Sequence, residues 1–158
     1  MGTSRWWRWD VLIASGAGSG LVPKAPGTFG TLAALLPWWG LSVLPAWAYL
    51  LVCAAVFALG VWVSARLTRE PGIEDPGWIV IDEWVGIWIA LFLLPPGWAW
   101  LVAGFLLFRL FDIAKPWPVG WADRAVHGGL GVMLDDALAG LMALACVQAA
   151  AWGLAAVS

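Results

Sequence analysis

The stretch WIVIDEWVGIWIALFLLPP, residues 78–96, places two adjacent carboxylates, Asp82 and Glu83, inside an apolar run that two prolines end. A charged side chain within a membrane span costs about 2.5 to 3.5 kcal/mol on insertion scales. Such residues therefore usually face a bundle interior, a partner charge or an ion. A second acidic pair, Asp135 and Asp136, precedes another long apolar run. Together the two pairs predict a helical membrane protein that holds a metal ion.

The composition of the chain supports this class. Of 158 residues, 63% are hydrophobic and 11% are charged, and the mean hydropathy is +0.87. Such a chain cannot supply the polar surface of a water-soluble domain. Apolar segments of near-spanning length follow one another at 28–45, 46–65, 78–94, 97–108 and 137–157. We therefore predict an all-α fold: a polytopic membrane helical bundle of about four to five spans, forming a single domain over residues 1–158.

The basic residues indicate the orientation of these spans. They gather at one end of successive segments: Arg5, Arg8, Lys24, Arg66, Arg69, Lys115 and Arg124. The turns near 44–46 and 95–97 carry no charge. By the positive-inside rule, the N-terminus and the loops 66–77 and 112–128 are cytoplasmic. The chain has no basic run of the kind that binds nucleic acid, so the expected partners are membrane lipids and not nucleic acid.

The acidic residues converge on the same cytoplasmic layer. Asp112 closes the fourth span, whereas Asp82 and Glu83 lie near the start of the third. Several carboxylate oxygens from different helices at one depth are what a hard cation requires. We expect the metal ligands to be Asp82, Glu83, Asp135 and Asp136. A set of structural ion pairs, such as Arg109 with Asp112 three residues on, is the alternative.

A phosphate-handling site also needs donors near this layer. The segment GAGSGLVPKAPGTFG, residues 16–30, offers glycines that permit close backbone approach and the charge of Lys24. Thr28 occupies the position expected for the N-cap of the following helix. The segment is neither a Walker A loop nor a dinucleotide-binding fingerprint. A re-entrant loop without a ligand would have the same composition, so both interpretations stay open.

Further polar residues follow the fourth span. Arg109 and Lys115 are candidate phosphate ligands, and Pro116 is expected to end the helix just after Lys115. His127, the only histidine, is either a substrate contact or a loop residue that caps a helix. Asp123 and Glu70 are expected to be solvated loop residues.

Four blocks of sequence resemble a known family when they are taken in order. They are LVPKAPGTFGTL (21–32), DPGWIVIDEWVGIWIA (75–90), FRLFDIAKPWPVGWADR (108–124) and HGGLGVMLDDALAG (127–140). In this order and spacing they are similar to phosphatidylglycerophosphatase A, a bacterial membrane lipid phosphatase, over roughly residues 10 to 145. The resemblance implies removal of the terminal phosphate of phosphatidylglycerophosphate, dependent on Mg²⁺, at the cytoplasmic face of the inner membrane.

The residues and the resemblance together define the expected site. The candidate catalytic residues are Asp82, Glu83, Asp112 and Asp136, and the candidate substrate-binding residues are Lys24, Thr28, Arg109, Lys115 and His127. Neither cysteine is placed for nucleophilic attack, so water activated by Mg²⁺ is the simplest mechanism, and an aspartyl-phosphate intermediate is the alternative. A small ion-coupled transporter that uses intramembrane carboxylates is the competing class of function, and a non-catalytic scaffold is a third.

Overall fold

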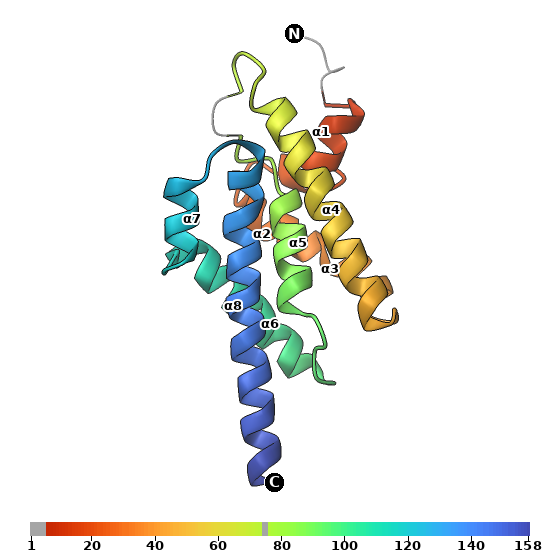
Figure 1. Cartoon of the computed structure of the whole chain (residues 1–158). Coiled ribbons are helices and arrows are strands. Elements are labelled where there is room, and N and C mark those ends of the chain that lie inside the picture. The colour runs from red at the N-terminus through yellow and green to blue at the C-terminus, as the bar shows by residue number, and fades with distance from the viewer. Residues whose placement is uncertain (1–5, 74–75) are drawn as a thin grey trace.

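The computed structural model of the chain describes residues 6–73 and 76–158, and all the regular secondary structure of these residues is helical (Figure 1). Arg5 and Asp75, which contribute to the charge pattern and to one sequence block, lie outside the described residues. The elements are α1 Trp9–Ala14, the 3₁₀ helix η1 Ser19–Leu21, α2 Pro26–Ala33, α3 Leu35–Leu41, α4 Ala46–Leu67, α5 Ile81–Ala90, α6 Trp98–Ala114, α7 Val119–Ala125 and α8 Gly128–Val157.

Two of these helices, α4 and α8, are long and apolar enough to cross a membrane, with mean hydropathies of 2.2 and 1.8. The helices α5 and α6 are shorter, with 10 and 17 residues. Figure 1 shows α4, α5, α6 and α8 running along the long axis of the molecule, with α1 near one end and the end of α8 at the other. The all-helical prediction is confirmed, whereas the number of spans stays a prediction.

The first predicted span, 28–45, is divided in the structure. Helix α2 ends at Ala33 and α3 begins at Leu35. Pro37 explains the interruption, because it has no N–H to donate to the carbonyl of Ala33 and its ring would clash with that carbonyl. The apolar segment therefore forms two short helices instead of one continuous span.

The other helix boundaries also differ from the hydropathy pattern. Helix α8 begins at Gly128, well before the predicted start at residue 137, so Asp135 and Asp136 lie within the helix and not ahead of it. The pattern missed this because it was divided at charged residues, whereas the backbone continues as a helix through them. Helix α5 ends at Ala90, and the turn that follows, which includes Leu93 with a φ of 52°, leads to Pro95.

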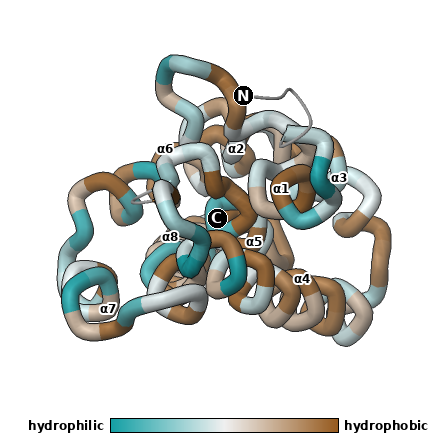
Figure 2. Tube along the Cα trace, turned by 90° about the horizontal axis from the view of Figure 1, so that it is seen from above, coloured by the Kyte–Doolittle hydropathy of each residue, from teal (hydrophilic) through white to brown (hydrophobic). Residues whose placement is uncertain are grey.

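Helix α5 lies at the centre of the bundle, between α4 and α8 in both views (Figures 1 and 2). Its residues Val85, Ile87 and Trp88 are buried. Trp88 Nε1 donates a hydrogen bond to the carbonyl of Ala34 at 2.9 Å, and the hydroxyl of Tyr49 donates to the carbonyl of Trp88. These contacts fix α5 against the α2–α3 junction and α4, which positions the acidic first turn of α5.

Candidate active site

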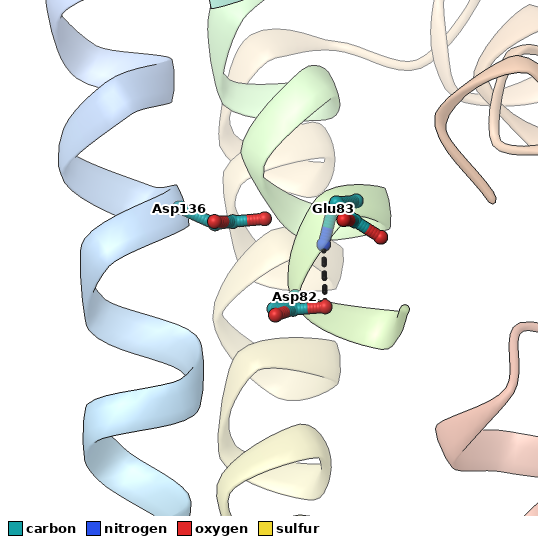
Figure 3. Close-up of side chains that lie close together, drawn as sticks. All are labelled: Asp82, Glu83 and Asp136. Atoms are coloured by element: carbon teal, nitrogen blue, oxygen red, sulfur yellow. Dashed lines mark hydrogen bonds between the residues drawn. The ribbon is translucent and has the colours of Figure 1, made fainter. Parts of the chain in front are cut away.

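The first turn of α5 and the third turn of α8 bring three carboxylates together (Figure 3). Asp82, Glu83 and Asp136 each offer one oxygen, and these oxygens lie within 4.8 Å of one another. Figure 3 shows Asp136 projecting from α8 toward the two acids of α5. The backbone N–H of Glu83 donates to Asp82 Oδ1 at 3.0 Å, which orients that carboxylate.

Two glycines permit this approach of α5 and α8. A Cβ atom on Gly140 would collide with the carbonyl of Gly86, and a Cβ atom on Gly86 would lie 2.9 Å from the carbonyl oxygen of Asp136 on α8. Gly86 lies four residues after Asp82 and Gly140 four residues after Asp136, so each glycine is on the same helix face as an acid. Close contact at these two positions therefore brings the acids of the two helices to one level.

Two oxygens of the carboxylate group have no hydrogen-bond partner in the described part of the chain. These are Glu83 Oε2 and Asp136 Oδ2, and both are buried. Buried carboxylate oxygens without partners are costly unless a cation compensates them. Three converging carboxylates supply the hard oxygen ligands that Mg²⁺ prefers, so this donor set fits a divalent cation.

Arg109 connects three helices at the edge of the carboxylate group. Its guanidinium donates from Nη1 to Asp112, lies 3.6 Å from Glu83 Oε1 and donates from Nη2 to Thr28 Oγ1 at 3.4 Å. The sequence left open whether Arg109 pairs with Asp112 or faces the site, and both are observed. Only 15% of the Arg109 side chain is exposed. Arg109 is therefore a largely desolvated positive charge beside the acids.

The glycine-rich segment approaches the same place through Gly27. A Cβ atom at Gly27 would lie 2.5 Å from Glu83 Oε1 and 3.3 Å from Arg109 Nη2. The expected N-cap role of Thr28 is wrong, because α2 already begins at Pro26. The N-cap position is occupied by Ala25, which has a φ of 49°. Thr28 instead lies in the first turn, where its hydroxyl faces Arg109.

A cleft of about 420 Å³ opens beside the carboxylate group. Its polar lining consists of Asp82, Glu83, Asp112, Lys115, Asp123, His127, Asp135 and Asp136. All the predicted acids line this single cleft, together with two of the predicted substrate-binding residues.

Lys115 crosses part of this cleft. Its Nζ atom donates to Asp123 Oδ1 and to Asp135 Oδ2, both at 2.8 Å. Burial alone would lower the pKa of Lys115, but these two hydrogen bonds outweigh it and raise the pKa above its ordinary value. Asp135, predicted as a metal ligand, thus faces Lys115 and does not belong to the group of Asp82, Glu83 and Asp136.

Two predicted substrate-binding residues lie at the periphery. His127 lines the cleft from the N-cap position of α8, is exposed, and makes no capping hydrogen bond through its side chain. Lys24 is exposed between η1 and α2, and it has no hydrogen bond or ion pair with any described residue. The structure therefore brings Arg109 and Lys115 to the acids but leaves Lys24 outside their contacts.

Sequence reasoning did not identify Asp123 as a site residue. It lies on α7, not on a loop, and binds Lys115. The spacing of eight residues gave no signal, because a helix break and a turn separate the two positions. Glu70 lies on a loop, as expected, and accepts a hydrogen bond from Arg8 at 2.6 Å, whereas the expected loop position of Asp123 is wrong.

Comparison with known sequences decides the family. A profile of the family described as Phosphatidylglycerophosphatase A matches residues 12–151, which include every candidate site residue. The chain belongs to the phosphatidylglycerophosphatase A family. The resemblance of the four sequence blocks is thereby confirmed. No solved structure matches the chain.

Three curated relatives cover most of the chain. Phosphatidylglycerophosphatase A of Escherichia coli is 46% identical over 132 residues, which are 83% of this chain and 77% of the relative. Phosphatidylglycerophosphatase A of Haemophilus influenzae is 43% identical over 140 residues, 87% of this chain and 86% of the relative. A Bacteroides thetaiotaomicron protein with the provisional name phosphatidylinositol-3-phosphatase is 43% identical over 150 residues, 90% of this chain and 93% of the relative.

Proposed function

We propose that this member of the phosphatidylglycerophosphatase A family hydrolyses the terminal phosphate of phosphatidylglycerophosphate, giving phosphatidylglycerol and inorganic phosphate. The observation that carries the proposal is the convergence of Asp82, Glu83 and Asp136, next to Arg109, in a chain of this family. A phosphate monoester is doubly charged, so a site for it needs both a cation and positive side chains.

We further propose that the reaction depends on Mg²⁺. Asp82, Glu83 and Asp136 would hold the ion, which when bound neutralises charge on the phosphoryl group and makes a water molecule more acidic. The unpartnered oxygens Glu83 Oε2 and Asp136 Oδ2 support this assignment. Direct attack by one of the acids, giving an aspartyl phosphate, is the alternative mechanism.

The other polar residues have separate roles in this proposal. Arg109 and Lys115 bind phosphoryl oxygens and stabilise the charge that develops as the bond to the leaving oxygen breaks. Asp112 accepts the proton of the attacking water at Oδ1, because Arg109 occupies only Oδ2. The departing glycerol oxygen takes up one proton from solvent, and Asp112 releases the proton that it accepted to solvent, so one water molecule is consumed for each phosphate released.

The same proposal includes the location of the protein. We infer a multi-pass protein of the bacterial inner membrane whose cleft faces the cytoplasm. The helices α4 and α8 support membrane insertion by length and hydropathy. The positive-inside rule supports the orientation, since Lys115 and Arg124 flank the cleft and the opposite turns are uncharged.

Phosphate release from purified protein in mixed micelles tests the proposal. We expect release from phosphatidylglycerophosphate with Mg²⁺, loss of release in excess chelator, and recovery when Mg²⁺ is restored. Glu83→Gln is the inactive control. Full activity in chelator would exclude the metal mechanism. Phosphate release from phosphatidylinositol 3-phosphate alone would show that this lipid, and not phosphatidylglycerophosphate, is the substrate. No release from either lipid would favour the transporter or scaffold class.

A further inference from the structure

A second concave surface lies on α4, away from the catalytic cleft. This groove of about 520 Å³ is lined by Ala58, Val61, Trp62, Ala65, Arg66 and Arg69. The lining residues from Ala58 to Arg66 recur at intervals of three and four, so they form one face of the helix, and Arg69 lies just beyond the helix end at Leu67. None of them lines the cleft beside the carboxylates. We call this surface the α4 groove.

The α4 groove is apolar along most of its length and basic at one end. Its apolar part lies within a helix that meets the length and hydropathy criteria for a membrane span. Only 28% of the apolar window of α4 is buried inside the protein, against 50% for α8. Trp62 is 53% exposed. The groove therefore faces the surroundings of the bundle, which in a membrane are lipid.

The basic end of the groove is held in place. Arg66 Nε donates to Asp10 Oδ2 at 3.1 Å, and Asp10 is buried. The Arg66 guanidinium carbon lies 5.8 Å from the centre of the Trp9 ring, and Trp9 stacks on Trp62 at 5.5 Å. These contacts fix the guanidinium of Arg66 beside the wall of the groove.

Both arginines keep donors available. The Nη atoms of Arg66 make no hydrogen bond with a described residue, because the contact to Asp10 uses only Nε. Arg69 is exposed and has no ion pair or hydrogen bond within residues 6–73 and 76–158. Guanidinium groups with free N–H edges bind phosphate oxygens in a defined geometry.

We propose that the α4 groove binds one anionic phospholipid of the surrounding bilayer. Its acyl chain lies along Ala58, Val61 and Trp62, and its phosphate binds Arg66 and Arg69. Basic residues at the cytoplasmic end of a membrane helix attract anionic headgroups, each changing lipid affinity by about fivefold. The apolar part favours a lipid over a soluble phosphate. This inference rests on α4 lying in a membrane and is independent of the catalytic proposal.

Native mass spectrometry of the delipidated full chain tests this site. The protein receives equal mole fractions of phosphatidylglycerol and phosphatidylcholine with the same acyl chains. We expect one tightly bound phosphatidylglycerol in the wild type. Arg69→Gln should weaken its binding about fivefold, and the double variant Arg66→Gln/Arg69→Gln roughly 25-fold. Arg124→Gln, which removes an exposed charge on α7, is the matched control and should bind as the wild type does.

Two further arms distinguish the α4 groove from the active site and from a site for soluble phosphate. Glu83→Gln should keep the bound phosphatidylglycerol, because the active site is not involved, and inorganic phosphate should not displace the lipid. Phosphate release by Arg69→Gln should stay within about twofold of the wild type, which shows that the variant is folded. Three outcomes would each overturn the proposal. They are an unchanged preference for phosphatidylglycerol in Arg69→Gln and in the double variant, equal binding of phosphatidylcholine by the wild type, and displacement of the lipid by inorganic phosphate.

Discussion

The ammonium of Lys115 lies 2.8 Å from the carboxylate of Asp123. Because Lys115 is the C-cap residue of α6 and Asp123 lies on α7, this ion pair connects the two helices. Asp123 is 45% exposed, and ion pairs with that much exposure contribute little to stability. Its effect is therefore on the position of Lys115, which also binds Asp135. A residue that was expected to be a solvated loop acid therefore lines the cleft beside the carboxylates.

Asp123→Asn should lower kcat/KM by about fivefold and leave the melting temperature within a few degrees of the wild type. The amide removes the charge that holds Lys115 at the cleft but hardly changes packing. Asp123→Glu should restore most of the activity. Kinetics and thermal unfolding of both variants provide the measurement, and wild-type kinetics in Asp123→Asn would remove Asp123 from the site.

Asp82→Asn, Glu83→Gln and Asp136→Asn should each reduce phosphate release by at least about 100-fold at saturating Mg²⁺. Removing a ligand charge weakens the ion more than it disturbs packing, and even outer contacts of metal ligands commonly change activity by 10- to 100-fold. Glu70→Gln is the control, since Glu70 binds Arg8 and does not line the cleft. Near-normal turnover in any of the three variants would exclude that residue as a ligand.

Asp135→Asn should have a milder effect than Asp136→Asn, although the two residues are adjacent. Asp135 binds Lys115, whereas Asp136 belongs to the three-carboxylate group. We expect Asp135→Asn to leave the Mg²⁺ concentration for half-maximal activity unchanged and Asp136→Asn to raise it. If both variants raised this Mg²⁺ concentration equally, Asp135 would be a metal ligand, as the sequence had predicted.

Gly140→Ala should destabilise the protein by about 1 to 3 kcal/mol, because the added methyl group would overlap the carbonyl of Gly86. Gly153→Ala on the same helix is the matched control. No atom lies within 4 Å of the position of its added Cβ, so the higher helix propensity of alanine should stabilise it by up to about 1 kcal/mol. Chemical unfolding in detergent compares the two, and equal stabilities would show that the α5–α8 contact is looser than described.

Asp10→Asn should destabilise the protein at neutral pH. Burial alone would raise the pKa of Asp10, but hydrogen bonds from Arg8, the backbone of Val11 and Arg66 outweigh it, so the pKa is lowered. A carboxylate with a lowered folded pKa stabilises the fold above its unfolded pKa of about 3.9, and this stabilisation is lost as the pH falls through the folded value. The difference between wild type and variant should therefore be large at pH 7 and shrink below pH 4. A constant difference over this range would contradict the assigned role of the ion pairs.

The sequence indicated which acidic residues lie near one another better than it predicted the helix boundaries. A carboxylate in an apolar run is informative because burying it is costly, which is why Asp82, Glu83, Asp135 and Asp136 were predicted to act together. The structure brings Asp82, Glu83 and Asp136 together, whereas Asp135 faces Lys115. The contact between Lys115 and Asp123 could not be predicted from the sequence. The distance between the two residues depends on the end of α6 and on the turn before α7, which sequence alone does not define. The predicted span 28–45 is divided at Ala34 because Pro37 lacks a backbone N–H. An average of hydropathy does not detect this missing hydrogen-bond donor.

Helix α8 carries its acidic pair near one end and continues as an apolar helix to Val157. At about 1.5 Å per residue, the part beyond Asp136 is long enough by itself to cross a hydrocarbon layer of about 30 Å. In the proposed orientation the cleft then lies at the boundary between lipid and water, level with phospholipid headgroups. Substrate reaches it by two-dimensional diffusion within one leaflet. The concentration that governs turnover is therefore the mole fraction of substrate in the bilayer surface and not its amount per volume of solution.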